Sequence, residues 1–186
     1  MKTNKFFIII LFAVVIILVI GTICYVWIKK SGAPPTVVSE IKTFEECAAK
    51  YPVLETYPRQ CKTPDGRSFV ENIGNELEKQ DFIRLTSPRP NQSVRSPLQI
   101  MGQARGMWYF EASFPIKIFD ANGKQLGIAI AQAQGDWMTE NFVAFQATLE
   151  FEKPATKTGE LVFQKDNPSG DPAKDDALRI PVKFSE

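Results

Sequence analysis

From residue 82 onward the chain alternates between apolar and polar positions with a period of two, which is typical of strands with one buried face. The alternation is clearest in VAFQATLEFE (143–152) and ALRIPVKFS (177–185). Pro181 has no backbone N–H to donate to a neighbouring strand, so we expect its strand to lie at a sheet edge. Five further segments have a strand-like composition: Phe82–Thr86, Leu98–Ala104, Phe110–Phe119, Lys124–Ala133 and Glu160–Lys165.

Turn residues separate these segments. DANGK (120–124) joins two of them through Asn-Gly, a strong hairpin signal. Seven short strands without a sustained helical pattern predict an all-β fold, an immunoglobulin-like antiparallel β-sandwich over residues 82–186. The Cys, Trp, Cys spacing of antibody domains is absent, so this expectation concerns the architecture alone.

The opposite end of the chain is apolar. Phe6–Ile28 is a run of 23 residues without a charge, and about 20 apolar residues suffice to cross a membrane as a helix. Tyr25 and Trp27 lie at its end, where aromatic residues favour the membrane interface. We expect a single transmembrane helix at 6–28 that stays attached; a cleaved signal peptide and a buried soluble helix are the alternatives.

The cysteines suggest on which side of the membrane the rest of the chain lies. Cys24 is inside the apolar run, which leaves Cys47 and Cys61 as the two thiols of the remaining chain. Such a pair predicts one disulfide in an exported domain, with two unrelated reduced thiols as the alternative. We therefore expect a cytoplasmic amino terminus and an extracytoplasmic remainder, although lysines on both sides of the run leave the orientation open on charge alone.

These observations divide the chain into six parts. A short helix is expected near Cys47, and a turn at Thr63–Arg67 before an extended SFV. The parts are a cytoplasmic tail (1–5), the membrane helix (6–28), an extracytoplasmic linker (29–43), a two-cysteine module (44–72), a linker or short helix (73–81) and the sandwich (82–186).

Charge and composition exclude several functions. The 22 basic residues almost balance the 21 acidic ones, so no electrostatic reason favours nucleic acid as a partner. The chain has no histidine, which excludes Ser-His-Asp and Cys-His catalysis and histidine-based zinc sites. We expect no enzyme activity, no cofactor and no metal.

The sandwich segment also resembles a known family. SPRPNQSVRSPLQIMGQARGMWYFEASFPIKIFDANGKQLG, GDWMTENFVAFQATLEF and DNPSG are similar to the immunoglobulin-like domain of bacterial spore germination proteins, which also occurs in other bacterial envelope proteins. The resemblance covers Phe82–Ser185 and implies an envelope-associated sandwich used for binding or assembly. The matching positions are Pro97, Leu98, Gly102, Ala104, Trp108, Phe110, Glu111, Phe114, Pro115, Asp120, Gly123, Asp136, Trp137, Phe142, Phe145 and Asp166–Gly170.

The loop DNPSG (166–170) contains candidate binding residues. Asp166, Asn167, Ser169 and Gly170 are favourable turn residues, and the strands on both sides require a chain reversal. The same oxygens, with those of the nearby acids 171, 175 and 176, could instead bind calcium or contact a protein or glycan. The spacing does not fit the twelve-residue calcium loop, so we expect a structural turn.

The remaining candidates lie between residues 108 and 137. Glu111 interrupts an apolar stretch, so it is expected to face solvent or to pair with Arg84 or Arg105. Asp136 is expected to accept hydrogen bonds from a turn. Three aromatic residues are expected in the core or its rim, with a sugar-binding platform as the alternative: Trp108, Tyr109 and Trp137.

Together these features predict a single-pass binding or scaffolding protein of the bacterial envelope. Its partners would be the membrane, through 6–28, and an envelope protein or cell-wall component. Two alternatives stay open: recognition of cell-wall glycan, and inhibition of an envelope protease by the loop between Cys47 and Cys61.

Overall fold

The computed structural model describes residues 16–22, 25 and 40–185, which fall into two compact units, 1–41 and 42–186. Residues 16–22 are helical. Within the described residues, no helix is both long enough and apolar enough to cross a membrane. Most of the predicted span, 6–28, lies outside the described residues, so the membrane anchor stays a prediction.

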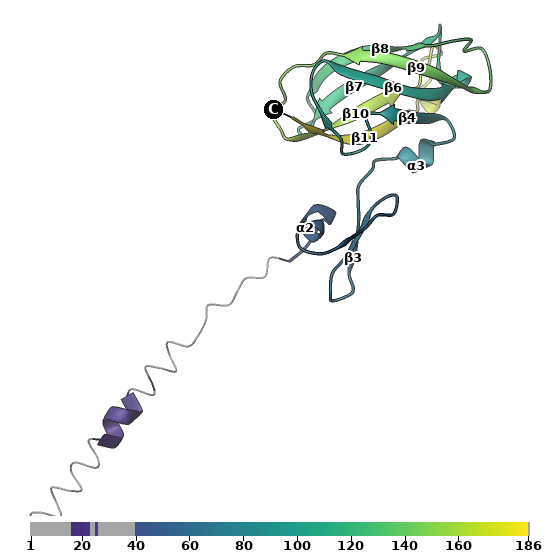
Figure 1. Cartoon of the computed structure of the whole chain (residues 1–186). Helices are drawn as coiled ribbons and strands as arrows, with labels where there is room; N and C mark the ends of the chain where they lie inside the picture. The colour runs from purple at the N-terminus through teal and green to yellow at the C-terminus, as the bar shows by residue number, and fades with distance from the viewer. Residues whose placement is uncertain (1–15, 23–24, 26–39, 186) are drawn as a thin grey trace, which may run out of the picture. The chain divides into compact units, whose positions relative to one another are not determined.

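The second unit contains a mostly β domain built from eight strands (Figure 1). Neighbouring strands are hydrogen-bonded in the order β4-β6-β9-β8-β7-β10-β11-β5. The strands are β4 (Ile83–Ser87), β5 (Ser93–Val94), β6 (Leu98–Arg105), β7 (Ser113–Asp120), β8 (Gln125–Ala133), β9 (Phe142–Leu149), β10 (Thr158–Gln164) and β11 (Ala177–Phe184).

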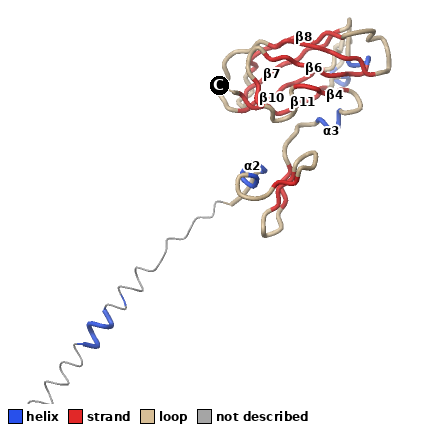
Figure 2. The backbone as a smooth tube through the Cα atoms, viewed as in Figure 1, coloured by secondary structure: helices blue, strands red, loops and turns tan. Residues whose placement is uncertain are grey.

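The sheet curls into two facing layers where β8 meets β9, because these two strands pair over a short length. β8 pairs with β7 along nearly its whole length, but it pairs with β9 at Gln132 and Ala133 alone. The layer β4-β6-β9 can therefore fold over the layer that contains β7, β10 and β11, as the tube in Figure 2 shows. This confirms the predicted immunoglobulin-like sandwich, which is antiparallel as expected except for the unpredicted two-residue strand β5, which pairs in parallel with β11.

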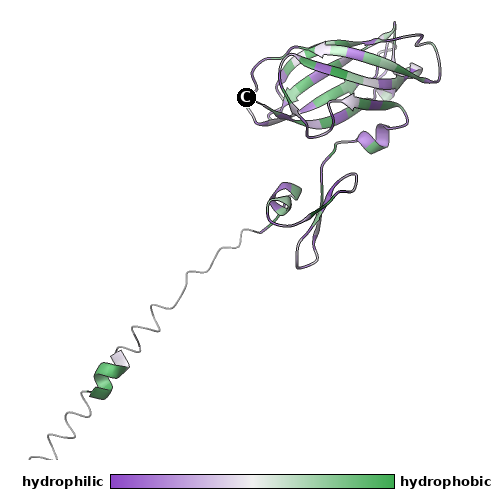
Figure 3. Cartoon of the chain, in the orientation of Figure 1, coloured by the Kyte–Doolittle hydropathy of each residue, from purple (hydrophilic) through white to green (hydrophobic). Residues whose placement is uncertain are grey.

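The core lies between the two layers. Inward-facing residues alternate with outward-facing polar ones, which gives the strands of Figure 3 their alternating colours. The Phe145 ring of β9 lies 4.9 Å from that of Phe114 on β7 and 6.4 Å from that of Phe163 on β10, measured between ring centroids. These three fully buried rings hold the layers together through apolar burial and edge-to-face contact.

Two turns show how well local sequence predicts the connections. The predicted hairpin at 120–124 is present: Gly123 has φ +82°, and Asp120 Oδ1 accepts hydrogen bonds from the N–H groups of Asn122 and Lys124. The start of β7 was predicted wrongly, at Phe110 instead of Ser113. Glu111 and Ala112 form a tight turn there, both with positive φ, which places Phe110 opposite Ser113.

The two-cysteine module precedes the sandwich. Its helix α2 (Phe44–Ala48) begins after Thr43, whose side chain accepts a hydrogen bond from the Glu46 N–H. Three short antiparallel strands follow: β1 (Val53–Leu54), β2 (Gln60–Lys62) and β3 (Ser68–Val70). The predicted disulfide joins Cys47 of α2 to Cys61 of β2, with both cysteines fully buried.

Candidate functional site

The segment between the module and the sandwich follows the open edge of β11. The Asn75 N–H donates to Arg179 O at 3.1 Å, and Asn75 Oδ1 accepts from the Arg179 N–H at 2.7 Å. Asn75 Nδ2 also donates to Ala177 O at 2.9 Å. One asparagine thus occupies the place of a neighbouring strand and satisfies backbone groups that an exposed edge would leave free.

The next part of the same edge is covered by the loop after β4. Pro181 O accepts from the Asn91 N–H at 2.7 Å, and the Lys183 N–H donates to Gln92 O at 3.0 Å. N–H groups of alternate residues point to the same side of a strand, so the missing N–H of Pro181 falls on this outer side. The prediction of an edge strand is therefore correct only for the part of β11 before Lys183, because the two-residue strand β5 pairs with its end and is the terminal strand of the sheet.

Gly74 allows the backbone of this segment to pass close to β11. Its φ is +70°, and a Cβ atom at this position would lie 1.9 Å from Arg179 O. A side chain would therefore meet both an unfavourable backbone conformation and a backbone atom that cannot move away easily. After Gly74 and Asn75, the short helix α3 (Glu76–Lys79) leads into β4, and Lys79 Nζ lies 2.6 Å from Asp176 Oδ1.

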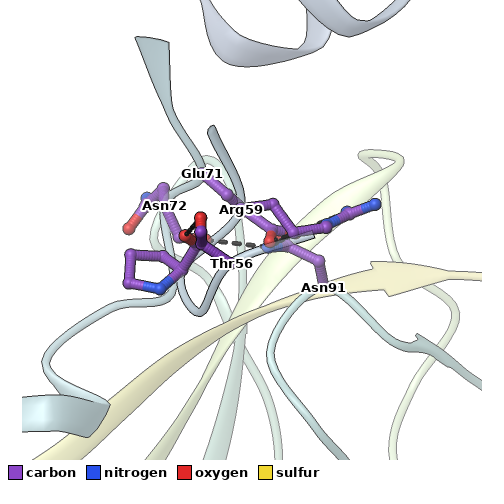
Figure 4. A network of polar contacts seen from close by, with 6 residues as sticks. Thr56, Arg59, Glu71, Asn72 and Asn91 are labelled. Carbon is purple, nitrogen blue, oxygen red and sulfur yellow. Dashed lines mark hydrogen bonds and ion pairs between the residues drawn. The ribbon is translucent and has the colours of Figure 1, made fainter. Parts of the chain in front are cut away.

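A buried carboxylate joins the module to the sandwich (Figure 4). Arg59 binds Glu71 through two hydrogen bonds, of 2.9 and 2.7 Å, and the Glu71 side chain is 7% exposed. Asn91 of the sandwich donates to Glu71 Oε1 at 3.0 Å and to Asn72 O at 2.8 Å. The left-handed φ of Asn91, +62°, accompanies these contacts.

A second carboxylate lies at the same junction. Arg89 Nη1 lies 2.7 Å from Glu76 Oε1, whose side chain is 8% exposed. Arg89 also donates to the Tyr57 hydroxyl at 2.9 Å, and its guanidinium lies 5.4 Å from the centre of the Tyr57 ring. Tyr57, which belongs to the loop between the cysteines, is thereby held against the sandwich.

Lowering the pH changes the contributions of Glu71 and Glu76 to the stability of the fold in opposite directions. The hydrogen bonds from Arg59 hold the pKa of Glu71 below its ordinary value of 4.5. The contact therefore stabilises the fold above pH 4.5, and this contribution is lost as the pH falls through the lowered pKa. Burial raises the pKa of Glu76 despite its pairing with Arg89, so protonation of Glu76 favours the folded state.

At one end of the sandwich the surface forms a broad groove of about 860 Å³, here called the end groove. This volume is within the range of ligand-binding clefts. The residues that line it come from the loop after β5, the connection between β9 and β10, and the end of β11: Arg95, Ser96, 151–157, Phe184 and Ser185.

Phe151 and Phe184 line the end groove and are here called its aromatic wall. Each packs against a glycine, where a side chain would leave no room for it. A Cβ at Gly127 would lie 2.9 Å from Cβ of Phe151, and one at Gly159 would lie 2.6 Å from Cζ of Phe184. The two aromatic side chains therefore pack directly on the backbone of β8 and β10. Their ring centroids are 5.9 Å apart, and both residues are half-buried.

The end groove is positively charged. Arg95, Lys153 and Lys157 line it, and their side chains have no ion-pair partner within the part of the chain that the structure describes. The acid of the lining, Glu152, is paired with Lys124 at 2.7 Å, which holds the pKa of Glu152 below its ordinary value. A concave surface with unpaired cations attracts anionic ligands.

The aromatic residues that the sequence suggested as a sugar-binding platform do not line the end groove. Trp108 is 1% exposed and Tyr109 is 4% exposed. Tyr109 donates its hydroxyl hydrogen to Val143 O at 2.8 Å, and burial raises its pKa to about 12. Neither ring offers a face on which a sugar could stack, whereas Trp137 is half-buried. The expectation of packing in the core or its rim is therefore confirmed.

Glu111 and Asp136 lie in turns at the other end of the sandwich from the end groove, before the start of β7 and after the end of β8. Glu111 is exposed. Arg84 and Arg105, considered as its partners, instead lie over the Phe142 ring, at 4.2 and 4.3 Å from its centre. Asp136 accepts a hydrogen bond from the Met138 N–H at 3.0 Å, as expected of a turn residue.

The loop 166–170 reverses the chain, and hydrogen bonds of the Asn167 side-chain amide hold its conformation. Asn167 Nδ2 donates to Asp171 O and to Asp175 Oδ1, both at 2.8 Å, and Asn167 Oδ1 accepts from the Ser169 hydroxyl at 2.6 Å. Gly170 has φ +65°, and the Asp166 N–H donates to Trp108 O. No group of three acidic, cysteine or histidine side chains in the described residues is suited to hold a metal ion.

The sequence did not predict the end groove or the binding of Asn75 to β11. The groove had one local signal, the connection EKPATK (152–157), in which a proline and two lysines lie between strands. Loops held by a rigid sheet often carry function. Nothing in the local pattern shows that this loop meets Arg95 and Phe184.

The comparison with known families agrees with the resemblance. Residues 82–171 match the model of a family described as the immunoglobulin-like domain of bacterial spore germination. The sandwich is therefore similar to this family from β4 to the loop that follows β10. No curated protein and no solved structure matches the chain.

Proposed function

We propose that this protein is a non-catalytic binding or scaffolding protein of the bacterial envelope. In this proposal residues 6–28 anchor it in the membrane with the amino terminus in the cytoplasm, and residues 29–186 lie outside. The disulfide between Cys47 and Cys61 supports an exported location. The similarity of residues 82–171 to an immunoglobulin-like family supports a binding role instead of catalysis.

The observation that carries the proposal is the end groove, a concave surface on the sandwich with three cations that have no ion-pair partner among the described residues. The module contacts the same domain through Glu71 and Tyr57. The segment that follows the module is bound to this domain through Asn75 and Glu76. The module and the sandwich would thus act as one head, with the groove as its binding surface.

Digestion of spheroplasts tests the location on which this function depends. We expect protease added outside to remove residues 82–186, detected with an antibody against the sandwich, while a cytoplasmic marker stays intact. The matched control is the same digestion after lysis, which should remove both. Protection of the sandwich until lysis would contradict the envelope function.

A further inference from the structure

We propose that the end groove binds an anionic polysaccharide, a chain of sugar rings that carries carboxylate or phosphate groups. This assignment rests on the proposed function and names the ligand class of the same site. Three features of the groove lead to it: its cations, its aromatic wall and the hydroxyl group of Ser96.

The cations select for negative charge. Arg95, Lys153 and Lys157 line one hollow from two separate segments of the chain, and each lacks an ion-pair partner in the described residues. Glu152 does not neutralise them, because it is engaged by Lys124 outside the groove lining. Carboxylates or phosphates of a ligand would form charge-assisted hydrogen bonds with these cations.

The aromatic wall selects for rings with apolar faces. Phe151 and Phe184 lie side by side with their ring planes inclined by 51°, and both line the groove while they remain half-buried. The C–H faces of a sugar ring bury apolar area against such a surface. A small inorganic anion would leave this wall unused.

The polar rim fits hydroxyl groups better than a peptide backbone. Ser96 Oγ accepts from the Phe151 N–H at 3.0 Å, which leaves its own O–H to donate to a ligand. The segment 151–157 belongs to no strand, so it does not present the row of free backbone groups to which an extended peptide adds. The groove therefore favours an anionic sugar chain over an acidic peptide.

A titration with defined probes tests this assignment. The full chain in nanodiscs of uncharged lipid is titrated with a uronic-acid hexamer, a sugar-phosphate hexamer, the neutral hexamer and hexaglutamate. We expect at least one anionic sugar to bind more than about tenfold tighter than the neutral hexamer and hexaglutamate. The two anionic sugars distinguish carboxylate from phosphate recognition.

Charge reversal locates the site. We expect Lys153→Glu with Lys157→Glu to weaken the binding of that sugar by at least about tenfold. The matched control, Lys62→Glu with Lys174→Glu, makes the same change in net charge on exposed lysines outside the groove and should leave binding unchanged.

Equal losses in the two variants would overturn the groove as the site. Binding of hexaglutamate as tight as that of the sugars, or no binding of any sugar, would overturn the ligand class. The purified protein answers these questions independently of spheroplast digestion, so a wrong ligand can be told from a wrong location.

Discussion

Replacing Gly74 with alanine is expected to release the segment between the two-cysteine module and the sandwich from the β11 edge while both parts stay folded. A Cβ at Gly74 would lie 1.9 Å from Arg179 O, so the chain must move away from the strand. Asn75 would then lose its three hydrogen bonds to Ala177 and Arg179. At about 1 kcal/mol for each hydrogen bond, the binding of this segment to β11 should weaken by about 3 kcal/mol.

The Arg179 amide reports this loss directly. Its N–H donates to Asn75 Oδ1, so its protection from hydrogen exchange should fall by roughly a hundredfold. Gly170→Ala is the matched control: Gly170 has a similar φ of +65°, but a Cβ there would meet nothing within 4 Å. If both variants leave the exchange of Arg179 equally slow, the described docking is wrong.

Phe145→Ala is expected to cause the largest loss of stability, about 3–5 kcal/mol in the free energy of unfolding. The Phe145 side chain is 1% exposed and contacts Phe114 and Phe163 of the opposite layer. Gly102 faces its ring, and a Cβ there would lie 2.7 Å from Cζ of Phe145. The substitution leaves a cavity where the two layers meet.

Urea unfolding measures this effect, with Phe110→Ala as the control. Phe110 is 40% exposed, so the same truncation there should cost about 1 kcal/mol or less. Equal losses at the two positions would contradict the packing of β9 against β7 and β10.

The parts predicted from sequence are those specified by neighbouring residues. Alternation placed the long strands within a few residues, and DANGK placed the hairpin, because both signals depend on local geometry alone. The turn at Glu111 and Ala112 lacked such a signal. Its positive φ values normally favour Asn or Gly, and hydrogen bonds between Phe110 and Ser113 close the turn instead of a turn-forming residue type.

The candidate site was harder to predict because distant segments form it. Asn75 meets Arg179 across 104 positions of sequence, and the end groove brings Arg95 beside 151–157 and Phe184. Of the three aromatic residues that the sequence suggested, Trp108 and Tyr109 pack in the core and Trp137 is half-buried. Period-two alternation says which residues face inward, but it does not say which loops meet at the ends of a sandwich.

Photo-crosslinking in cells tests most directly whether the end groove is the binding surface. A photoreactive residue is placed at Ala155, an exposed residue of the groove lining, or at Ala173, an exposed residue in the 3₁₀ turn Pro172–Lys174 that precedes β11. We expect an envelope component to be linked from position 155 and not from position 173, and Lys153→Glu with Lys157→Glu should abolish the link. No product from position 155, or the same product from both positions, would contradict the account.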